Sequence, residues 1–289
     1  MITLLKGAPA GAALREKASA MIEALKEKGV TPGLAVVRVG EEAGDLSYEK
    51  AIYKRCGAMG IEVRTCAFCG PTDGELQAQI RALNADPSVH GILMMRPLPK
   101  GLDEAAAREL IAPEKDVDGC GSASLAGVFT GSGTGFCPCT AQAAVEILDQ
   151  CGVEIAGKKA AVIGRSLVIG RPAAMLLLHR NATVTLCHSR TADLREAVRG
   201  ADIVIAATGR PESLDSSFFR SGQTVIDVGA SWSEAKGKIC GDVDMDSLIA
   251  ADEGGALDIN ITPVPGGVGA VTTSVLALHV AEAAARQNP

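Results

Sequence analysis

The stretch "AAVIGRSLVIGRPAAMLLL", residues 160–178, gives the strongest indication of the protein's architecture. It has the pattern of a hydrophobic strand ending at Gly164, a turn flanked by Gly164 and Gly170, and a helix whose predicted first residue is Pro172. A helix N-terminus directly after a strand offers unpaired N–H groups and the positive end of the helix dipole to a phosphate. The spacing is Gly-x5-Gly rather than the commoner G-x-G-x-x-G, so an ordinary tight strand-to-helix turn remains an alternative for this stretch alone.

Short aliphatic and β-branched runs alternate with helical patterns on both sides of this stretch. Strands are predicted near 33–39, 61–68 and 89–95 before it, and at "TVTLC", "DIVIAATG", "TVIDVG" and "ALDINIT" after it. Only 3% of residues are aromatic, whereas small aliphatic residues are plentiful, a composition suited to parallel strands buried on both faces. The sequence therefore predicts an α/β fold with a doubly wound parallel sheet.

The 289-residue chain is long enough for two domains. The segment 126–140, "AGVFTGSGTGFCPCT", is rich in glycine, serine and threonine and is interpreted as the crossing between them. We predict a first domain over residues 1–138 and a second over residues 139–267. A long helix within residues 268–289 is expected to return to the first domain.

Composition and charge favour work on small molecules. The net charge of -6 is modest and mixed in sign, so no basic face for nucleic acid is predicted. No apolar run reaches the ~18 residues that span a bilayer, and the N-terminus lacks the pattern of a signal peptide. Nine scattered cysteines predict free thiols in a reducing cytoplasm.

The strand pattern at 183–187 bears on the choice of dinucleotide. NAD-preferring sites usually place an acidic residue about 20 residues after the glycine turn, where it binds the ribose 2′-hydroxyl. Here the strand is followed by His188, Ser189 and Arg190, with no carboxylate. Ser189, Arg190 and Arg165 could receive a 2′-phosphate, which favours NADP, although Arg190 taken alone could be an ordinary solvated arginine.

No metal site is predicted. Cys66 and Cys69 have the spacing of a metal or redox pair, but no second pair with zinc-ribbon spacing follows. His90, His179 and His279 lack neighbouring carboxylate or cysteine partners in the sequence. The chain also has neither a G-x-S-x-G elbow nor an H-E-x-x-H helix, which disfavours hydrolysis by a catalytic triad or by zinc.

Together the motifs resemble the methylenetetrahydrofolate dehydrogenase/cyclohydrolase family. The motifs that carry the resemblance are "PEKDVDG", "PCT", "GRSLVIGRPAAMLLL", "NATVTLCHSRT", "ADIVIAATGRP", "VIDVGA", "GDVD" and "ITPVPGGVGAVT", in this order over nearly the whole chain. The resemblance implies an N-terminal folate-binding catalytic domain, a Rossmann domain for NADP, tetrahydrofolate derivatives as substrates and a homodimer. The implied dehydrogenase step passes a hydride from 5,10-methylenetetrahydrofolate to NADP, and the second step hydrolyses the methenyl product to 10-formyltetrahydrofolate.

The resemblance also implies a set of site residues. The residues that bind folate are expected to be Tyr48, Asp118, Pro263, Pro265, Gly266 and Gly267, with Tyr48 and Asp118 also catalytic. The residues that bind the cofactor are expected to be Gly164, Arg165, Ser166, Gly170, Ser189, Arg190 and Thr208. At Gly269–Thr272 the family's "GPMT" is replaced by "GAVT".

The cyclohydrolase activity of the family depends on a Tyr-x-x-x-Lys pair and on a glutamine in a "VQLPLP"-like stretch. Tyr48 matches the tyrosine, but the lysine position is Ile52 and the glutamine position is Met95. At about 100° per helical residue, Lys50 and Lys54 lie roughly 200° and 240° from Tyr48, so they face elsewhere. Tyr53 is likewise off that face. We expect a dehydrogenase with little or no cyclohydrolase activity.

Three alternatives remain. In the first, the enzyme is fully bifunctional because another group, or a water held by Tyr48, supports hydrolysis. In the second, it is a non-catalytic relative that uses Cys56, Cys66 or Cys69 as a redox sensor, although the intact cofactor motif argues against this. In the third, it is an amino-acid dehydrogenase, which would need a catalytic lysine or aspartate in the first domain.

Overall fold

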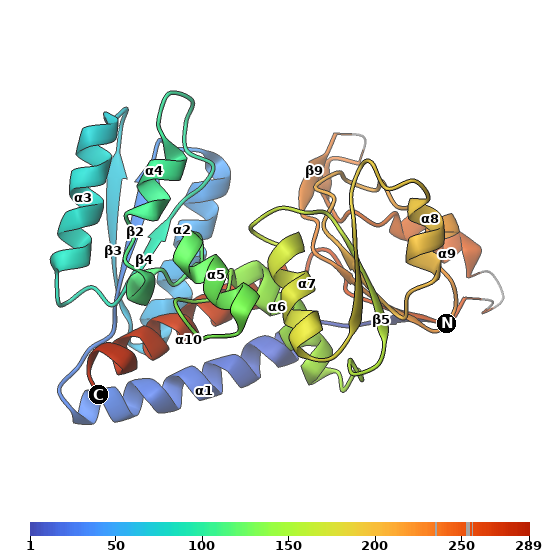
Figure 1. Cartoon of the computed structure of the whole chain (residues 1–289), viewed down its shortest axis with the longest axis horizontal. Helices are drawn as coiled ribbons and strands as arrows, with labels where there is room; N and C mark the ends of the chain where they lie inside the picture. Colours follow the sequence, from blue (N-terminus) through green and yellow to red (C-terminus); the bar gives the residue numbers. More distant parts are fainter. Residues whose placement is uncertain (235, 253–254, 256) are drawn as a thin grey trace. The chain divides into compact units, whose positions relative to one another are not determined.

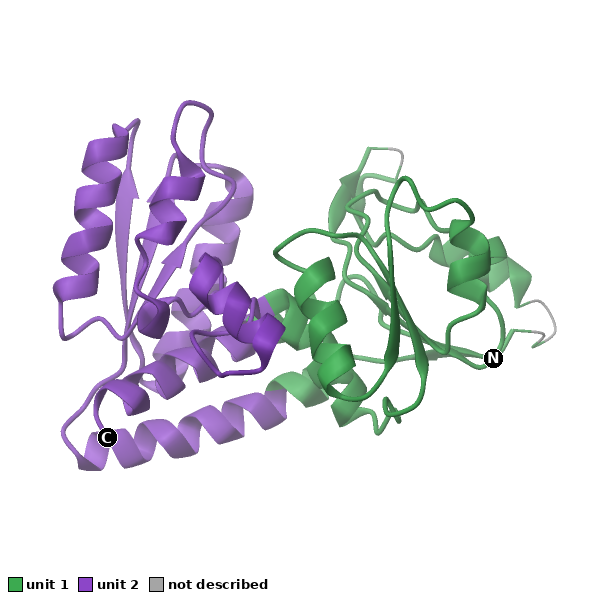
Figure 2. Cartoon of the chain, viewed as in Figure 1, with its two compact units in different colours: residues 1–11, 140–272 green, residues 12–139, 273–289 purple. Residues whose placement is uncertain are grey.

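The computed structural model describes residues 1–234, 236–252, 255 and 257–289, and its helices and strands are shown in Figure 1. The chain divides into two compact units (Figure 2). Unit 1 comprises Met1–Gly11 and Thr140–Thr272, and unit 2 comprises Ala12–Cys139 and Thr273–Pro289. The boundaries at 11 and 272 fall inside the helices α1 (Ala8–Glu27) and α10 (Gly269–Gln287).

Unit 1 is built on a six-stranded sheet in the order β1-β11-β8-β7-β5-β6, with every neighbouring pair parallel. The strands are β1 (Ile2–Leu4), β5 (Lys159–Ile163), β6 (Thr183–Cys187), β7 (Ile203–Ala206), β8 (Gln223–Asp227) and β11 (Ile259–Ile261). Because β6 and β7 lie on opposite sides of β5, the strand order reverses beside β5, where doubly wound folds bind ligands. The predicted parallel sheet is confirmed.

Helices and a small hairpin complete unit 1. They are α6 (Cys139–Gln150), α7 (Gly170–His179), α8 (Leu194–Arg199), η2 (Ser216–Phe218), α9 (Met245–Ala251) and the antiparallel pair β9 (Ser231–Ser233) and β10 (Lys238–Cys240). Val198, Phe219 and Leu248 form part of a core with Val204 and Val225 of the sheet, while α7 packs against β5 and β6. The central strands are therefore buried, as the aliphatic composition predicts.

Unit 2 contains a parallel three-stranded sheet in the order β3-β2-β4. Its elements, besides α1 and α10, are β2 (Gly33–Val39), α2 (Ala43–Met59), β3 (Glu62–Phe68), α3 (Asp73–Ala85), β4 (Gly91–Met94), α4 (Glu104–Glu109), η1 (Pro113–Lys115) and α5 (Ser122–Thr130). Every residue of the central strand β2 is buried. The three strands predicted before residue 100 are confirmed with their ends shifted by two residues at most.

Some boundaries differ from the sequence-based predictions. The helix α5 continues to Thr130 and α6 begins at Cys139, so only the later part of 126–140 is irregular. The helix α7 begins at Gly170, which places Pro172 at its third position rather than its first. Proline is still compatible there, because the first four N–H groups of a helix have no partner within it. Ala256, the first residue of the predicted strand "ALDINIT", lies outside the described residues.

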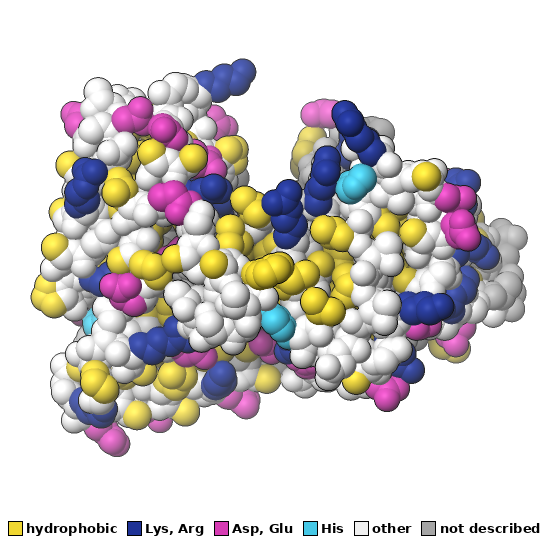
Figure 3. All heavy atoms as spheres, viewed as in Figure 1, with side chains coloured by type: hydrophobic (Ala, Val, Ile, Leu, Met, Phe, Trp, Pro, Cys, Tyr) yellow, Lys and Arg dark blue, Asp and Glu magenta, His cyan; other side chains and the backbone are white. Residues whose placement is uncertain are grey.

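From Thr273 onward, the C-terminal helix α10 belongs to unit 2 together with residues 12–139, as its predicted return to the first part of the chain requires. The Lys17 ammonium lies 3.3 Å from a Glu282 carboxylate oxygen, and the Arg286 side chain donates to the Gly135 carbonyl at 3.0 Å. Acidic and basic side chains occur on both units over the face shown in Figure 3. Within the described residues, no helix has the length and apolar character required to cross a membrane.

Candidate active site

The turn after β5 is closed by two glycines that approach neighbouring backbone. Gly164 has a φ of +120°, and a Cβ added to it would lie 2.1 Å from the Ala207 carbonyl oxygen. A Cβ on Gly170 would lie 2.0 Å from the Gly164 carbonyl oxygen. Both distances are far below contact, so any larger residue would force the turn open. The Gly-x5-Gly spacing thus reflects a turn folded tightly against the loop that follows β7.

This turn presents polar groups at the N-terminus of α7. The Ile169 N–H donates to the Ser166 hydroxyl at 3.1 Å, and no side chain caps the first turn of the helix. Arg165 and Ser166 are exposed. In the first turn of the helix the Arg171 N–H donates to the Ser166 carbonyl at 3.1 Å and Pro172 has no N–H, so the groups suited to binding a phosphate here are the exposed Arg165 and Ser166 side chains and the Gly170 N–H.

The end of β6 lies beside the turn because the Gly164 N–H donates to the Cys187 carbonyl at 2.9 Å. Ser189 and Arg190 follow and are exposed. The Arg190 N–H donates to His188 Nδ1 at 3.1 Å, which shapes this loop. Arg165, Ser189 and Arg190 therefore occupy the carboxyl ends of two adjacent strands, at an edge without an acidic residue at 188–190.

Thr208, at the carboxyl end of β7, is held by a buried carboxylate that the sequence analysis left without a role. Asp242 accepts hydrogen bonds from the N–H groups of Thr208, Gly209 and Arg210 at 2.5, 3.1 and 3.1 Å. Asp227, the last residue of β8, in turn accepts from the N–H of Asp242 at 3.0 Å. Burial raises the pKa of Asp227 to about 7, against the hydrogen bonds from backbone N–H groups that lower it.

The segment Pro263–Gly267 lies at the carboxyl end of β11, on the same edge of the sheet. The Asp227 N–H donates to the Thr262 hydroxyl at 2.7 Å, which joins this strand end to β8. The Gly266 carbonyl accepts from the Gly7 N–H at 2.9 Å, and a Cβ on Gly267 would lie 2.6 Å from the Pro263 carbonyl oxygen. The structure thus brings this segment and the predicted cofactor residues to one edge of unit 1.

In unit 2, the helix α2 carries Tyr48, Ile52 and Cys56 at intervals of four residues, which places them on one face. Ile52 and Cys56 are fully buried. Lys50 and Lys54 are exposed, which confirms the prediction that neither lysine shares the face of Tyr48. No ammonium of α2 therefore lies on that face.

Asp118 lies close enough to Tyr48 to affect the ionisation of the tyrosine. Burial raises the pKa of Tyr48 well above its usual value, and the neighbouring Asp118 and Cys139 raise it further. Burial also raises the pKa of the Asp118 carboxyl, while Arg96 opposes this shift. The Arg96 guanidinium lies 3.3 Å from Asp118 Oδ2. The structure thus brings together the two predicted catalytic residues and an arginine that the sequence analysis did not single out.

The loop that carries Asp118 is fixed by its neighbours in "KDVDG". The Lys115 ammonium donates to the carbonyls of Asn84 and Asp86, both at 2.8 Å. Asp116 is buried and accepts from the Gly121 N–H at 2.9 Å and from the Ser124 hydroxyl at 2.6 Å. Lys115 and Asp116 are therefore structural, which leaves Asp118 as the acid of this motif available to a ligand.

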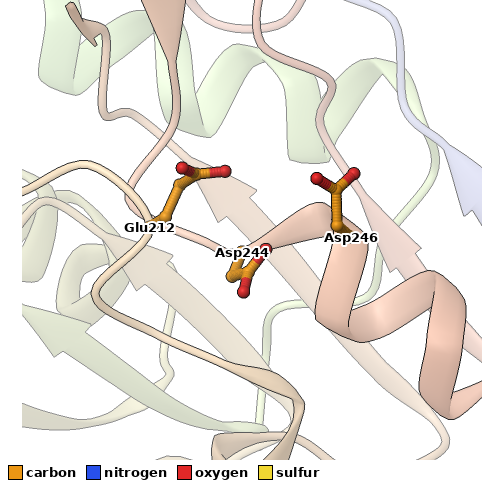
Figure 4. A group of neighbouring side chains, drawn as sticks. All are labelled: Glu212, Asp244 and Asp246. Carbon is orange, nitrogen blue, oxygen red and sulfur yellow. The ribbon is translucent and has the colours of Figure 1, made fainter. Parts of the chain in front are cut away.

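In the described part of the chain, one cluster of acidic side chains lies close enough together to hold a metal ion. It consists of Glu212, Asp244 and Asp246 (Figure 4). The Lys236 ammonium forms ion pairs with all three, including one of 2.5 Å to Asp246. A lysine already supplies the positive charge there, so the cluster is explained as an ion-pair network.

Comparisons with known proteins give a consistent result. Residues 5–118 match the family model described as tetrahydrofolate dehydrogenase/cyclohydrolase, catalytic domain, and residues 138–288 match its NAD(P)-binding domain. The chain is 45% identical over 291 residues to the bifunctional protein FolD of Alkaliphilus oremlandii, covering 100% of this chain and 99% of that protein.

Solved structures agree. The bifunctional enzyme FolD of Campylobacter jejuni superposes with a TM-score of 0.92 at 36% identity, covering 99% of each chain. The methylenetetrahydrofolate dehydrogenase-cyclohydrolase of Trypanosoma brucei, in complex with NADP cofactor and an inhibitor, has a TM-score of 0.89 at 32% identity and covers 99% of this chain and 98% of that one.

Proposed function

Because the chain belongs to the tetrahydrofolate dehydrogenase/cyclohydrolase family, we propose that it oxidises 5,10-methylenetetrahydrofolate to 5,10-methenyltetrahydrofolate with NADP and has lost most or all cyclohydrolase activity. The observation that carries this proposal is the buried Ile52 one helical turn from Tyr48, in place of the family's lysine. Met95, also buried, replaces the glutamine. The cofactor turn, by contrast, is intact.

The dehydrogenase step demands position more than proton transfer. NADP would accept the hydride, which the lone pair of a folate nitrogen helps to expel. We assign residues 1–138 with 268–289 to folate binding and residues 139–267 to NADP binding. In this assignment Tyr48 stacks on the folate, Asp118 accepts hydrogen bonds from the pterin ring, and Pro263, Pro265, Gly266 and Gly267 shape the wall of the site. Holding the two reacting carbons in contact supplies most of the acceleration.

The preference for NADP rests on the charge at the carboxyl ends of β5 and β6. Arg165, Ser189 and Arg190 are exposed there, and no acidic residue at 188–190 would repel a 2′-phosphate. Gly164, Ser166, Gly170 and Thr208 would line the remaining part of the cofactor site. The family resemblance further supports a homodimer acting in the cytoplasm.

Hydrolysis of the methenyl group needs a group that moves protons. Tyr48 is poorly suited alone, because its raised pKa keeps the phenol protonated near neutral pH. A second candidate function is that of the fully bifunctional enzyme, favoured by relatives that are named bifunctional. In that case another group, or a water held by Tyr48, would assist hydrolysis.

Two assays on the purified protein test the proposal. NADPH formation from 5,10-methylenetetrahydrofolate is expected, without acceleration of the decay of methenyltetrahydrofolate above its spontaneous rate. Comparable rates in the two assays would establish the bifunctional alternative. NADP binding without folate-dependent turnover would support a non-catalytic relative, and turnover of an amino acid instead would support the third alternative.

The variant Asp118→Asn is expected to raise the KM for 5,10-methylenetetrahydrofolate by about 10- to 100-fold, because one carboxylate acceptor becomes an amide donor facing the donors of the pterin. Steady-state kinetics at saturating NADP measure the effect. Asp149→Asn, which removes an exposed carboxylate paired with Arg180, is the matched control. An unchanged KM in Asp118→Asn would assign Asp118 a purely structural role.

A further inference from the structure

Arg96 is a partly buried charge to which the proposed chemistry assigns no role. It lies two residues beyond the end of β4, and its side chain is 14% exposed. Its Nη2 lies 3.3 Å from Asp118 Oδ2, so the two form an ion pair. Burial acts to lower the pKa of Arg96, but Asp118 and the nearby Glu104 shift it upward overall. The arginine therefore remains a cation beside the acid that is proposed to bind folate.

Most of the hydrogen-bonding capacity of Arg96 is unused. A guanidinium carries five N–H donors in a rigid plane. Among the described residues, only Asp118 accepts a hydrogen bond from it, and its Nε is buried without any partner. Leaving a buried donor unsatisfied is costly, so such a group calls for an explanation. A counterion for Asp118 would need only the nitrogen that is already engaged.

The paired side chains present donors and acceptors next to each other. Asp118 offers carboxylate lone pairs, and Arg96 offers N–H groups beside them. The edge of a pterin has the complementary order: an oxygen acceptor on C4, then the N3–H donor, then the 2-amino donor. If Asp118 accepts from N3–H and the amino group, a donor beside it faces the C4 oxygen.

We propose that Arg96 is a specificity-determining residue that donates a hydrogen bond to the 4-oxo group of the folate substrate. This inference rests on the proposed function, since it takes Asp118 as the pterin-binding acid. A donor to the C4 oxygen and a mere counterion of Asp118 are roles that can be told apart by experiment. Loss of a counterion weakens every ligand of Asp118 alike, whereas loss of a donor to the C4 oxygen weakens only ligands that carry that oxygen.

Two probes that differ at C4 test the proposal: tetrahydrofolate and 4-amino-4-deoxytetrahydrofolate. Their affinities are measured by isothermal titration calorimetry under anaerobic conditions. The wild type is expected to prefer the 4-oxo ligand, since the 4-amino group would direct its own donors at Arg96. In Arg96→Met the preference is expected to fall by about 10- to 100-fold, the effect of a hydrogen bond from a charged donor. It is expected to reverse if the more basic diamino ring pairs with Asp118 as a cation.

Arg108→Met is the matched control, because Arg108 lies in the same unit, its Nε is also buried without a hydrogen-bond partner in the described structure, and its ion pair is with Glu109 at 3.4 Å rather than with Asp118. The Arg108→Met variant should prefer the 4-oxo ligand over the 4-amino ligand by the same factor as the wild type. If Arg96→Met does not fold, Arg96→Lys decides, because a lysine keeps the charge but lacks the planar fork, so the preference should fall several-fold.

The outcomes distinguish failure of the proposed role of Arg96 from failure of the proposed function. A wild type that oxidises 5,10-methylenetetrahydrofolate but binds both probes equally overturns the role of Arg96 and leaves the proposed function standing. An unchanged preference in a folded Arg96→Met, or in Arg96→Lys, does the same. A wild type that neither binds tetrahydrofolate nor oxidises the methylene substrate overturns both.

Discussion

The double variant Ile52→Lys/Met95→Gln is expected to accelerate methenyltetrahydrofolate hydrolysis by about 10²- to 10⁴-fold over the wild type, the contribution of a positioned acid–base group. Ile52 shares a helical face with Tyr48 and is fully buried. A lysine there would have its pKa lowered by burial, toward the range in which it can exchange protons at neutral pH. The glutamine would restore a polar side chain at the second position.

The gain is expected to come with a loss of stability. A buried ammonium replaces an aliphatic side chain that fits its surroundings, and unpaired buried charge is among the most destabilising changes known. The thermal unfolding midpoint should therefore fall, while the dehydrogenase rate changes by less than the hydrolysis rate. The catalytic gain and the structural cost can be measured separately.

The matched control is Ile52→Met/Met95→Gln, because methionine has an unbranched chain like lysine but no charge. Hydrolysis is followed as loss of methenyltetrahydrofolate absorbance above the spontaneous rate, in the wild type and both variants. A folded Ile52→Lys/Met95→Gln variant that hydrolyses no faster than its methionine control would show that the missing lysine does not explain the proposed loss.

Substituting alanine for Gly170 is expected to raise the Kd for NADP by about 100-fold, the cost of misplacing binding groups by about 1 Å. The added Cβ would lie 2.0 Å from the Gly164 carbonyl oxygen and 3.0 Å from the Arg165 nitrogen. These are backbone atoms that no side-chain rotation can move. The turn must open, and Arg165 and Ser166 move with it.

Gly57→Ala is the appropriate control, since Gly57 lies in α2 and its added Cβ would meet nothing within 4 Å. Alanine is expected to stabilise that helix slightly and to leave NADP binding unchanged. Calorimetric titration with NADP compares the two variants with the wild type. Wild-type affinity in Gly170→Ala would remove the glycine turn from the proposed cofactor site.

The sequence predicts best where the signal is local. The turn from Gly164 to Gly170 and the face shared by Tyr48 and Ile52 follow from residues within seven positions of one another. The strand β1 could not be predicted from local sequence, because its three residues form a strand by pairing with β11, more than 250 residues later. Its short apolar run carries no periodicity of its own.

Non-local contacts also explain which site features were missed. Asp242 acquires its role from loop N–H groups at Thr208–Arg210, and a lone acid in "GDVD" does not reveal which donors will reach it. The residues around Arg96 match the family's glutamine-containing stretch, and that resemblance assigns no role to an arginine at this position. A charged residue two positions beyond the buried strand β4 was the available signal, and its partner Asp118 lies 22 residues away.

Neither compact unit is a contiguous piece of chain, and each passage between them occurs within a helix: α1, α6 and α10. During synthesis from the N-terminus, residues 2–4 are made more than 250 residues before β11 at 259–261, the strand with which they pair among the described residues. Residues 12–139 likewise form unit 2 only together with residues 273–289. Vectorial folding would finish one domain before the next is made. Here neither unit can be completed until its late segment, residues up to 272 for unit 1 and 273–289 for unit 2, has been synthesised.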